Sequence, residues 1–192
     1  IWLRRFAHAA RQFLDFERGR ARTIAARHAE IDGRMEFPVD AGGFVLRGRA
    51  DRIDRRHDGR FEIIDFKTGT LPDRNAMTAL LAPQLPLEAA MAAAGAFADV
   101  GSGESAELIF VKIANGPEAF RPTSFATGEL GVPGIAEAVL HKLHLQIDAL
   151  LLKDDRPLAA RVFPNAKQRH TGDYDHLARV AEWTLTDGGE EE

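Results

Sequence analysis

Apolar and polar residues alternate along much of the first part of the chain, and apolar residues recur at helical spacing in other stretches. Alternation with a period of two is typical of strands, whereas recurrence every three to four residues is typical of amphipathic helices. The pattern predicts strands over 32–40, 44–54, 61–67, 106–113 and 119–125, and helices over 1–30, 75–96 and 132–153. Strands that alternate with helices in this way favour an α/β fold.

Two of the predicted helices have features that bear on function. The segment 1–30 is rich in arginine, so it is either a helix that faces DNA or a partner, or a packed helix with a solvated arginine face. We favour the solvated face, because charge runs on helices are usually solvated. Pro83 and Pro86 interrupt the segment 75–96, and proline is best tolerated in the first turn of a helix. Gln84 is therefore expected at a helix start.

Length and composition limit the possible functions. A chain of 192 residues is expected to form one domain, over 1–186, followed by a frayed acidic tail over 187–192. The chain contains no cysteine, which excludes a thiol nucleophile or a cysteine-bound iron–sulfur cluster within it and suits a cytoplasmic protein. A net charge of −4 argues against a free-standing DNA-binding protein, because DNA affinity depends on cationic patches.

Charged residues within the apolar strand 61–67 indicate a catalytic or metal-binding site. Asp65 and Lys67 lie two residues apart, so they share one face of this strand. The pair Asp58-Gly59 just before the strand is a hairpin signal. If the hairpin is centred on that turn, Asp51 of the preceding strand lies beside Asp65. Burying such groups is costly unless they are paired.

Two carboxylates that converge beside an ammonium group suit a divalent cation. Carboxylate oxygens with open coordination positions favour Mg²⁺ or Mn²⁺. The alternative interpretation is a pair of exposed strand-edge aspartates and a solvated lysine. Arg49, Arg52 and Lys112 are candidate phosphate contacts in the first interpretation, and residues that maintain solubility in the second.

The residues around this cluster resemble the PD-(D/E)XK nuclease superfamily, in particular its RecB-like branch. The resemblance rests on G-R-A-D ending at Asp51, on I-D-F-K-T-G with Asp65 and Lys67, and on a glutamine motif that begins at Gln84. It implies a mixed central sheet flanked by helices, the restriction-endonuclease-like core. It also implies that Asp51, Asp65 and the carbonyl of Phe66 bind the metal, that Lys67 orients or activates the attacking water, and that Gln84 positions these groups.

Within that branch, the segments 81–88 and 172–183 resemble the carboxyl-terminal nuclease domain of the AddB family, in its alphaproteobacterial form. AddB-type subunits belong to a bacterial helicase–nuclease that processes double-strand breaks. The resemblance implies two partners: an AddA-type subunit, and single-stranded DNA that emerges from the helicase. Two features depart from the pattern. The cysteines of an iron–sulfur cluster are absent, and residues 1–40 contain no His or Glu motif for a further metal ligand, so we expect that an upstream helix is missing.

The sequence thus predicts a Mg²⁺- or Mn²⁺-dependent deoxyribonuclease of exonuclease type. Because an upstream metal ligand is expected to be missing, we expect the isolated chain to bind metal weakly and to cut DNA slowly or not at all. One alternative is a catalytically silent module with a nuclease fold that serves as a DNA channel or docks another subunit. Another is a carbohydrate- or nucleotide-hydrolase fold in which the D-x-K spacing arises by chance.

Overall fold

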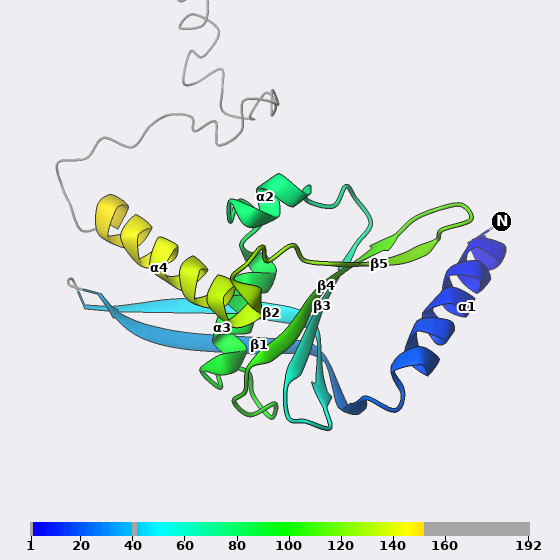
Figure 1. Cartoon of the computed structure of the whole chain (residues 1–192), viewed down its shortest axis with the longest axis horizontal. Coiled ribbons are helices and arrows are strands. Elements are labelled where there is room, and N and C mark those ends of the chain that lie inside the picture. Colours follow the sequence, from blue (N-terminus) through cyan, green and yellow to red (C-terminus); the bar gives the residue numbers. More distant parts are fainter. Residues whose placement is uncertain (1, 40–41, 152–192) are drawn as a thin grey trace, which may run out of the picture. The chain divides into compact units, whose positions relative to one another are not determined.

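The structure is a computed structural model that describes residues 2–39 and 42–151 (Figure 1). These residues belong to one compact unit, Ile1–Leu152, and residues 152–192 lie outside the described part of the chain. The tail predicted over 187–192 and the segment 172–183 also lie outside them. A single domain over 1–186 therefore stays a prediction.

A five-stranded mixed sheet forms the centre of the fold, with its strands in chain order. The strands are β1 (Ile24–Val39), β2 (Gly42–Arg56), β3 (Phe61–Lys67), β4 (Ser105–Ile113) and β5 (Phe120–Ser124). Neighbouring strands are antiparallel except for β3 and β4, which are parallel. Parallel neighbours need a crossover connection, and two helices lie in it. The predicted mixed sheet with flanking helices is confirmed.

Within the described residues, four helices accompany the sheet: α1 (Trp2–Arg20), α2 (Arg74–Thr78), α3 (Gln84–Ala93) and α4 (Gly131–Leu151). Figure 1 shows α1 on one side of β3 and β4, and α3 and α4 on the other. In the described part of the chain, no helix combines the length and the apolar character that crossing a membrane requires.

The two faces of the sheet have separate cores. On the face that α3 and α4 cover, here the α3 face, Phe61 and Ile63 of β3 pack in one cluster with Leu85 and Ala89 of α3. On the opposite face, here the α1 face, Phe13 and Phe16 of α1 pack against a second cluster. That cluster consists of Ile64, Ile109, Val111 and Phe120. Strand β3 is therefore covered on both faces, as its nearly continuous apolar sequence predicts.

The structure corrects two helix predictions. The first helix ends at Arg20, and the chain enters β1 at Ile24, whose Cα pairs with Arg56 of β2. The alanine-rich sequence after Ile24 is compatible with a helix, but pairing with β2 overrides this propensity. The segment 75–96 forms two helices, and α3 begins directly after Pro83. The prediction that Gln84 stands at a helix start is confirmed.

A buried network of ion pairs joins the end of α1 to the α1 face. Arg20 donates to Glu62 Oε2 (2.9 Å) and to Asp54 Oδ2 (2.6 Å). Arg52 donates to Asp54 Oδ1 (2.7 Å) and to Glu17 Oε1 of α1 (2.8 Å). Because Asp54 and Glu62 are almost fully buried, these arginines supply hydrogen bonds that water would otherwise have to provide.

Replacing Arg20 with alanine should lower the free energy of unfolding by about 3 kcal/mol, because it removes one partner from two buried carboxylates. The matched control is Arg18→Ala, which removes an exposed ion pair with Asp15 on the same helix. That change should cost no more than about 1 kcal/mol. Urea unfolding monitored by circular dichroism measures both variants. Equal midpoints for the two variants would show that the network does not hold α1 in place.

Candidate active site

The β2–β3 hairpin brings the predicted acids together. Its turn follows the prediction: Gly59 has a left-handed φ of 84°, and the N–H of Arg60 donates to Asp58 Oδ1 (3.0 Å). Cα pairing continues as far as Arg52 with Ile64. Asp51 and Asp65 are the next residues on their strands, so they stand opposite each other on the α3 face.

Asp51 accepts a hydrogen bond from β3. Its Oδ2 accepts the backbone N–H of Phe66 at 2.9 Å. A side-chain carboxylate therefore takes the place of a ladder bond where the paired part of the hairpin ends. This contact fixes the Asp51 carboxylate beside the backbone that carries Asp65 and Lys67.

Asp65 is the buried centre of the cluster, with 1% of its surface exposed. Its Oδ1 accepts from Lys67 Nζ (2.9 Å) and from Gln84 Nε2 (2.7 Å), whereas its Oδ2 is buried without a hydrogen-bond partner among the described residues. Burial raises the pKa of the Asp65 carboxyl above its usual range; the Lys67 ammonium opposes this shift, and the charge of Asp51 adds to it. A buried oxygen without a partner is costly and calls for an explanation.

Gln84 connects the strand to α3. Its Oε1 accepts from Lys67 Nζ (3.0 Å), and its Nε2 donates both to Asp65 and to Glu88 Oε1 (3.1 Å). Lysine is only a donor and a carboxylate only an acceptor, so this amide orientation is the one that satisfies all three neighbours. Pro86 is tolerated close behind Gln84 because the first turn of a helix has no intrahelical partner for its N–H groups.

Glu88 is a member of the cluster to which the sequence analysis assigned no role. It lies one helical turn after Gln84, is 4% exposed, and leaves Oε2 buried without a hydrogen-bond partner in the described part of the chain. Burial raises the pKa of Glu88 to about 7, and the charges of Asp65 and Asp51 contribute to the shift. The signal was present in the sequence, because residues four apart on a helix share a face.

The three predicted phosphate contacts lie in different places. Lys112 of β4 pairs with Lys67 across the sheet, and Arg49 is exposed and pairs with Glu30 (3.0 Å). Arg52 lies on the α1 face, where it is buried and bound to carboxylates. This placement does not support a phosphate contact for Arg52, because strand alternation turns it away from Asp51.

The donor set fits a hard divalent cation. The described residues contain no group of three or more His, Cys, Asp or Glu side chains arranged to hold a metal. Magnesium, however, is commonly bound through one or two carboxylates together with waters and substrate phosphates. Asp51 and Asp65 supply two such carboxylates, and the unpartnered Oδ2 of Asp65 has free acceptor capacity.

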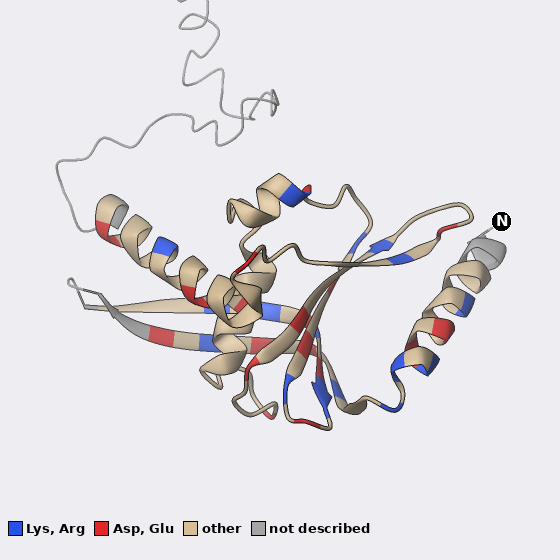
Figure 2. Cartoon of the chain, viewed as in Figure 1, with Lys and Arg blue, Asp and Glu red and all other residues tan. Residues whose placement is uncertain are grey.

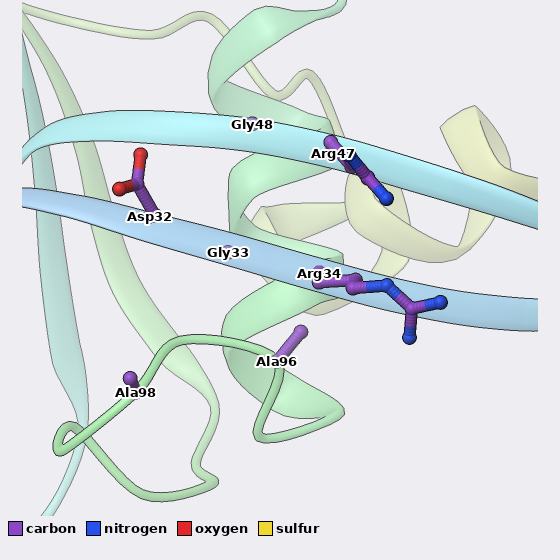
Figure 3. Close-up of a pocket in the computed structure, with 7 residues that line it drawn as sticks. All are labelled: Asp32, Gly33, Arg34, Arg47, Gly48, Ala96 and Ala98. Atoms are coloured by element: carbon purple, nitrogen blue, oxygen red, sulfur yellow. The ribbon is translucent and has the colours of Figure 1, made fainter.

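A separate cavity of about 580 Å³ lies at the β1–β2 hairpin, away from these acids. Figure 3 shows Arg34 and Arg47 at one end of it and Asp32 near the other. Its remaining lining is Gly33, Gly48, Ala96 and Ala98. It contains none of the acids, the lysine or the glutamine of the cluster.

Stability should fall as pH rises through the range in which Glu88 titrates. The folded state keeps a proton on Glu88 up to about pH 7, whereas the unfolded chain releases it near the ordinary glutamate pKa of 4.5. The free energy of unfolding should therefore drop by about 3 kcal/mol between pH 4.5 and 7. Glu88→Gln should remove this part of the drop in urea unfolding with EDTA present, while the contribution of Asp65 remains. An unchanged pH dependence in Glu88→Gln would contradict the assignment.

Comparison with known proteins places this site in a family. The sequence profile of the PD-(D/E)XK nuclease superfamily matches residues 1–182. An uncharacterized protein of Rickettsia bellii is 28% identical over 90 residues, and one of Rickettsia typhi is 29% identical over 91 residues. Each match covers 47% of this chain but 11% and 10% of the relative, so the chain spans about a tenth of the length of these curated relatives.

Among solved structures, the crystal structure of SSO0001 is similar over 75% of this chain and 60% of that chain, with a TM-score of 0.39 and 20% sequence identity. The superfamily profile covers every described strand and helix and all the residues of the cluster. The chain belongs to the PD-(D/E)XK nuclease superfamily.

Proposed function

We propose that this chain is the nuclease domain of a bacterial helicase–nuclease, and that it hydrolyses phosphodiester bonds of DNA during the repair of double-strand breaks. Its substrate is the single strand that a helicase delivers, its partner is an AddA-type subunit, and its place is the cytoplasm. Superfamily membership supports the nuclease activity. The order of the G-x-x-D, D-F-K-T-G and glutamine motifs supports a RecB-like nuclease. The resemblance of segments 81–88 and 172–183 supports the finer assignment to an AddB-type exonuclease.

The observation that carries the proposal is the convergence of Asp65, Lys67 and Gln84 beside Asp51. If these groups had a purely structural role, each carboxylate oxygen should accept a hydrogen bond. Asp54 on the opposite face meets this condition, because arginines donate to both of its oxygens. Here a buried carboxylate oxygen of Asp65 stays without a hydrogen-bond partner among the described residues. Titratable groups with raised pKa values, grouped in this way, are typical of functional sites.

The residues suit metal-assisted hydrolysis. Asp51 and Asp65, with the carbonyl of Phe66, would hold Mg²⁺ or Mn²⁺, which when bound supplies a water of lowered pKa and positive charge beside the phosphate. Lys67, held by Asp65 and Gln84, donates to the attacking water or to a phosphate oxygen. Hydrolysis adds that water across one P–O bond. The water oxygen remains on phosphorus, and a proton passes to the departing oxygen of the strand.

A second candidate is a domain that binds DNA or another subunit without cutting. The lack of a three-ligand group among the described side chains favours it. The two candidates differ in whether Lys67 matters for turnover, and in whether the acids bind a metal.

Lys67→Ala should abolish cleavage of single-stranded DNA and leave DNA affinity within about threefold, because losing one phosphate contact weakens binding far less than losing the lysine slows catalysis. Lys67→Arg should also fail, since a planar guanidinium cannot replace a compact ammonium between Asp65 and Gln84. Gel assays with Mg²⁺ or Mn²⁺ on the full-length protein, reconstituted with the AddA-type subunit, measure cleavage, and fluorescence anisotropy measures binding. Arg60→Ala is the control, because Arg60 is exposed and pairs with Asp58 at the hairpin turn. Near-normal cleavage by Lys67→Ala would rule out the proposed role.

Asp65→Asn should weaken Mn²⁺ binding at least tenfold in calorimetric titration, because it removes a charged ligand from a site with few ligands. Asp58→Asn, at the hairpin turn, should leave the binding unchanged. Equal affinity in Asp65→Asn and the unmodified chain would mean that the cation, if bound, is held elsewhere.

A further inference from the structure

A row of cationic residues runs from the cluster to the β5 edge of the sheet. Lys67 of β3 pairs with Lys112 of β4, and Lys112 pairs with Arg121 of β5. Residues that pair across neighbouring strands point to the same face, so all three lie on the α3 face. Figure 2 shows Lys and Arg gathered at this end of β3, β4 and β5.

The neighbouring row of paired residues, which lies closer to the β2–β3 turn, contains no cation. Asp65 pairs with Phe110, and Phe110 pairs with Thr123. The negative charge of that row is thus confined to Asp65 and Asp51, where a cation would bind. The cationic row begins at Lys67 and leads away from these acids.

Packing does not account for the row. Lys112 makes no hydrogen bond or ion pair within residues 2–39 and 42–151, and Arg121 is 54% exposed, with Glu118 at 3.7 Å. Exposed pairs of this kind stabilise a protein little. Like charges on neighbouring strands repel, so Lys67 beside Lys112 has a cost in the free protein. An anion lying across the three strands would remove that cost.

The row also matches the shape of one nucleic-acid backbone. Neighbouring strands lie about 4.8 Å apart, so the row extends over roughly 10 Å between β3 and β5. It is a single line of positive charge. A duplex presents two backbones separated by a groove of about 6 or 12 Å, which calls for a second line. A single phosphodiester strand needs only one line of positive charge.

We propose that Lys112 and Arg121 bind successive phosphates of single-stranded DNA, so that the strand crosses β3, β4 and β5 and reaches the cluster from the β5 edge. This inference rests on the proposed nuclease function and assigns the path of its substrate. Both residues are positioning residues: they hold the strand while Lys67 and the two acids face the scissile phosphate.

The test measures binding of a fluorescein-labelled single-stranded oligonucleotide by anisotropy in EDTA, so that no cleavage intervenes. Lys112→Ala/Arg121→Ala should weaken binding roughly tenfold at low salt and should reduce the slope of log K against log salt by about 1.4, the value for two contacts with a single strand. Lys112→Arg/Arg121→Lys should bind as the unmodified chain does, because phosphates accept either cation. Arg18→Ala/Arg60→Ala is the matched control; it removes two exposed, ion-paired cations elsewhere.

The outcomes separate this inference from the nuclease proposal. Normal affinity and salt slope in the Lys112→Ala/Arg121→Ala variant, or no binding by the unmodified chain, would overturn the proposed path. If the double variant loses as much affinity for a duplex of the same sequence as for the single strand, the single-strand assignment is overturned. If RNA of the same sequence binds more tightly than DNA, the assignment of DNA as the substrate is overturned. If binding depends on the two residues but the full-length protein cleaves DNA with neither Mg²⁺ nor Mn²⁺, the DNA path is supported and the nuclease proposal fails. Urea midpoints of the variants verify that they fold.

Discussion

The register of the β2–β3 hairpin is the constraint on which the rest of this structure depends. Because side chains alternate along a strand, the register sets the face on which each charged residue lies. It puts one pair of acids on each face: Asp51 stands opposite Asp65 on the α3 face, and Asp54 pairs with Glu62 on the α1 face. A slip of one residue would move the apolar residues of one strand to the opposite face of the sheet, so the buried faces hold the register in place.

Both pairs consist of carboxylates, but their hydrogen-bond partners differ. This difference distinguishes a pair that stabilises the fold from a pair that is a candidate for catalysis. Three arginines bind the pair on the α1 face, namely Arg20, Arg52 and Arg56. Among the described residues, Lys67 is the cation that binds the pair on the α3 face, and the amide of Gln84 and the backbone N–H of Phe66 also donate to it. One oxygen of Asp65 and one of Glu88 stay without partners among the described residues. The first arrangement fastens α1 to the sheet, whereas the second retains capacity to bind a cation.

The distribution of charge also resolves an apparent conflict. A net charge of −4 is unfavourable for a protein that acts on a polyanion. Much of the negative charge on the α1 face, however, is neutralised inside the fold by arginines that reach it from α1 and β2. Lys112 and Arg121 stand on the other face, beside the cluster. The positions of the charged residues on the α3 face therefore determine whether an anion can bind there, and the net charge of the chain does not.

The sequence by itself determined the features that depend on neighbours close in the chain. The Asp58-Gly59 turn, the bounds of β3, the position of Asp51 opposite Asp65 and the helix start at Gln84 all follow from local turn geometry, alternation or proline. Tertiary structure decided the others. The strand at Ile24 forms because β2 pairs with it, Arg52 is buried because α1 covers its face, and Lys112 lies beside Lys67 because β3 and β4 pair in parallel. A local pattern states which residues share a face, but burial and partners arise from contacts between segments that are distant in the chain.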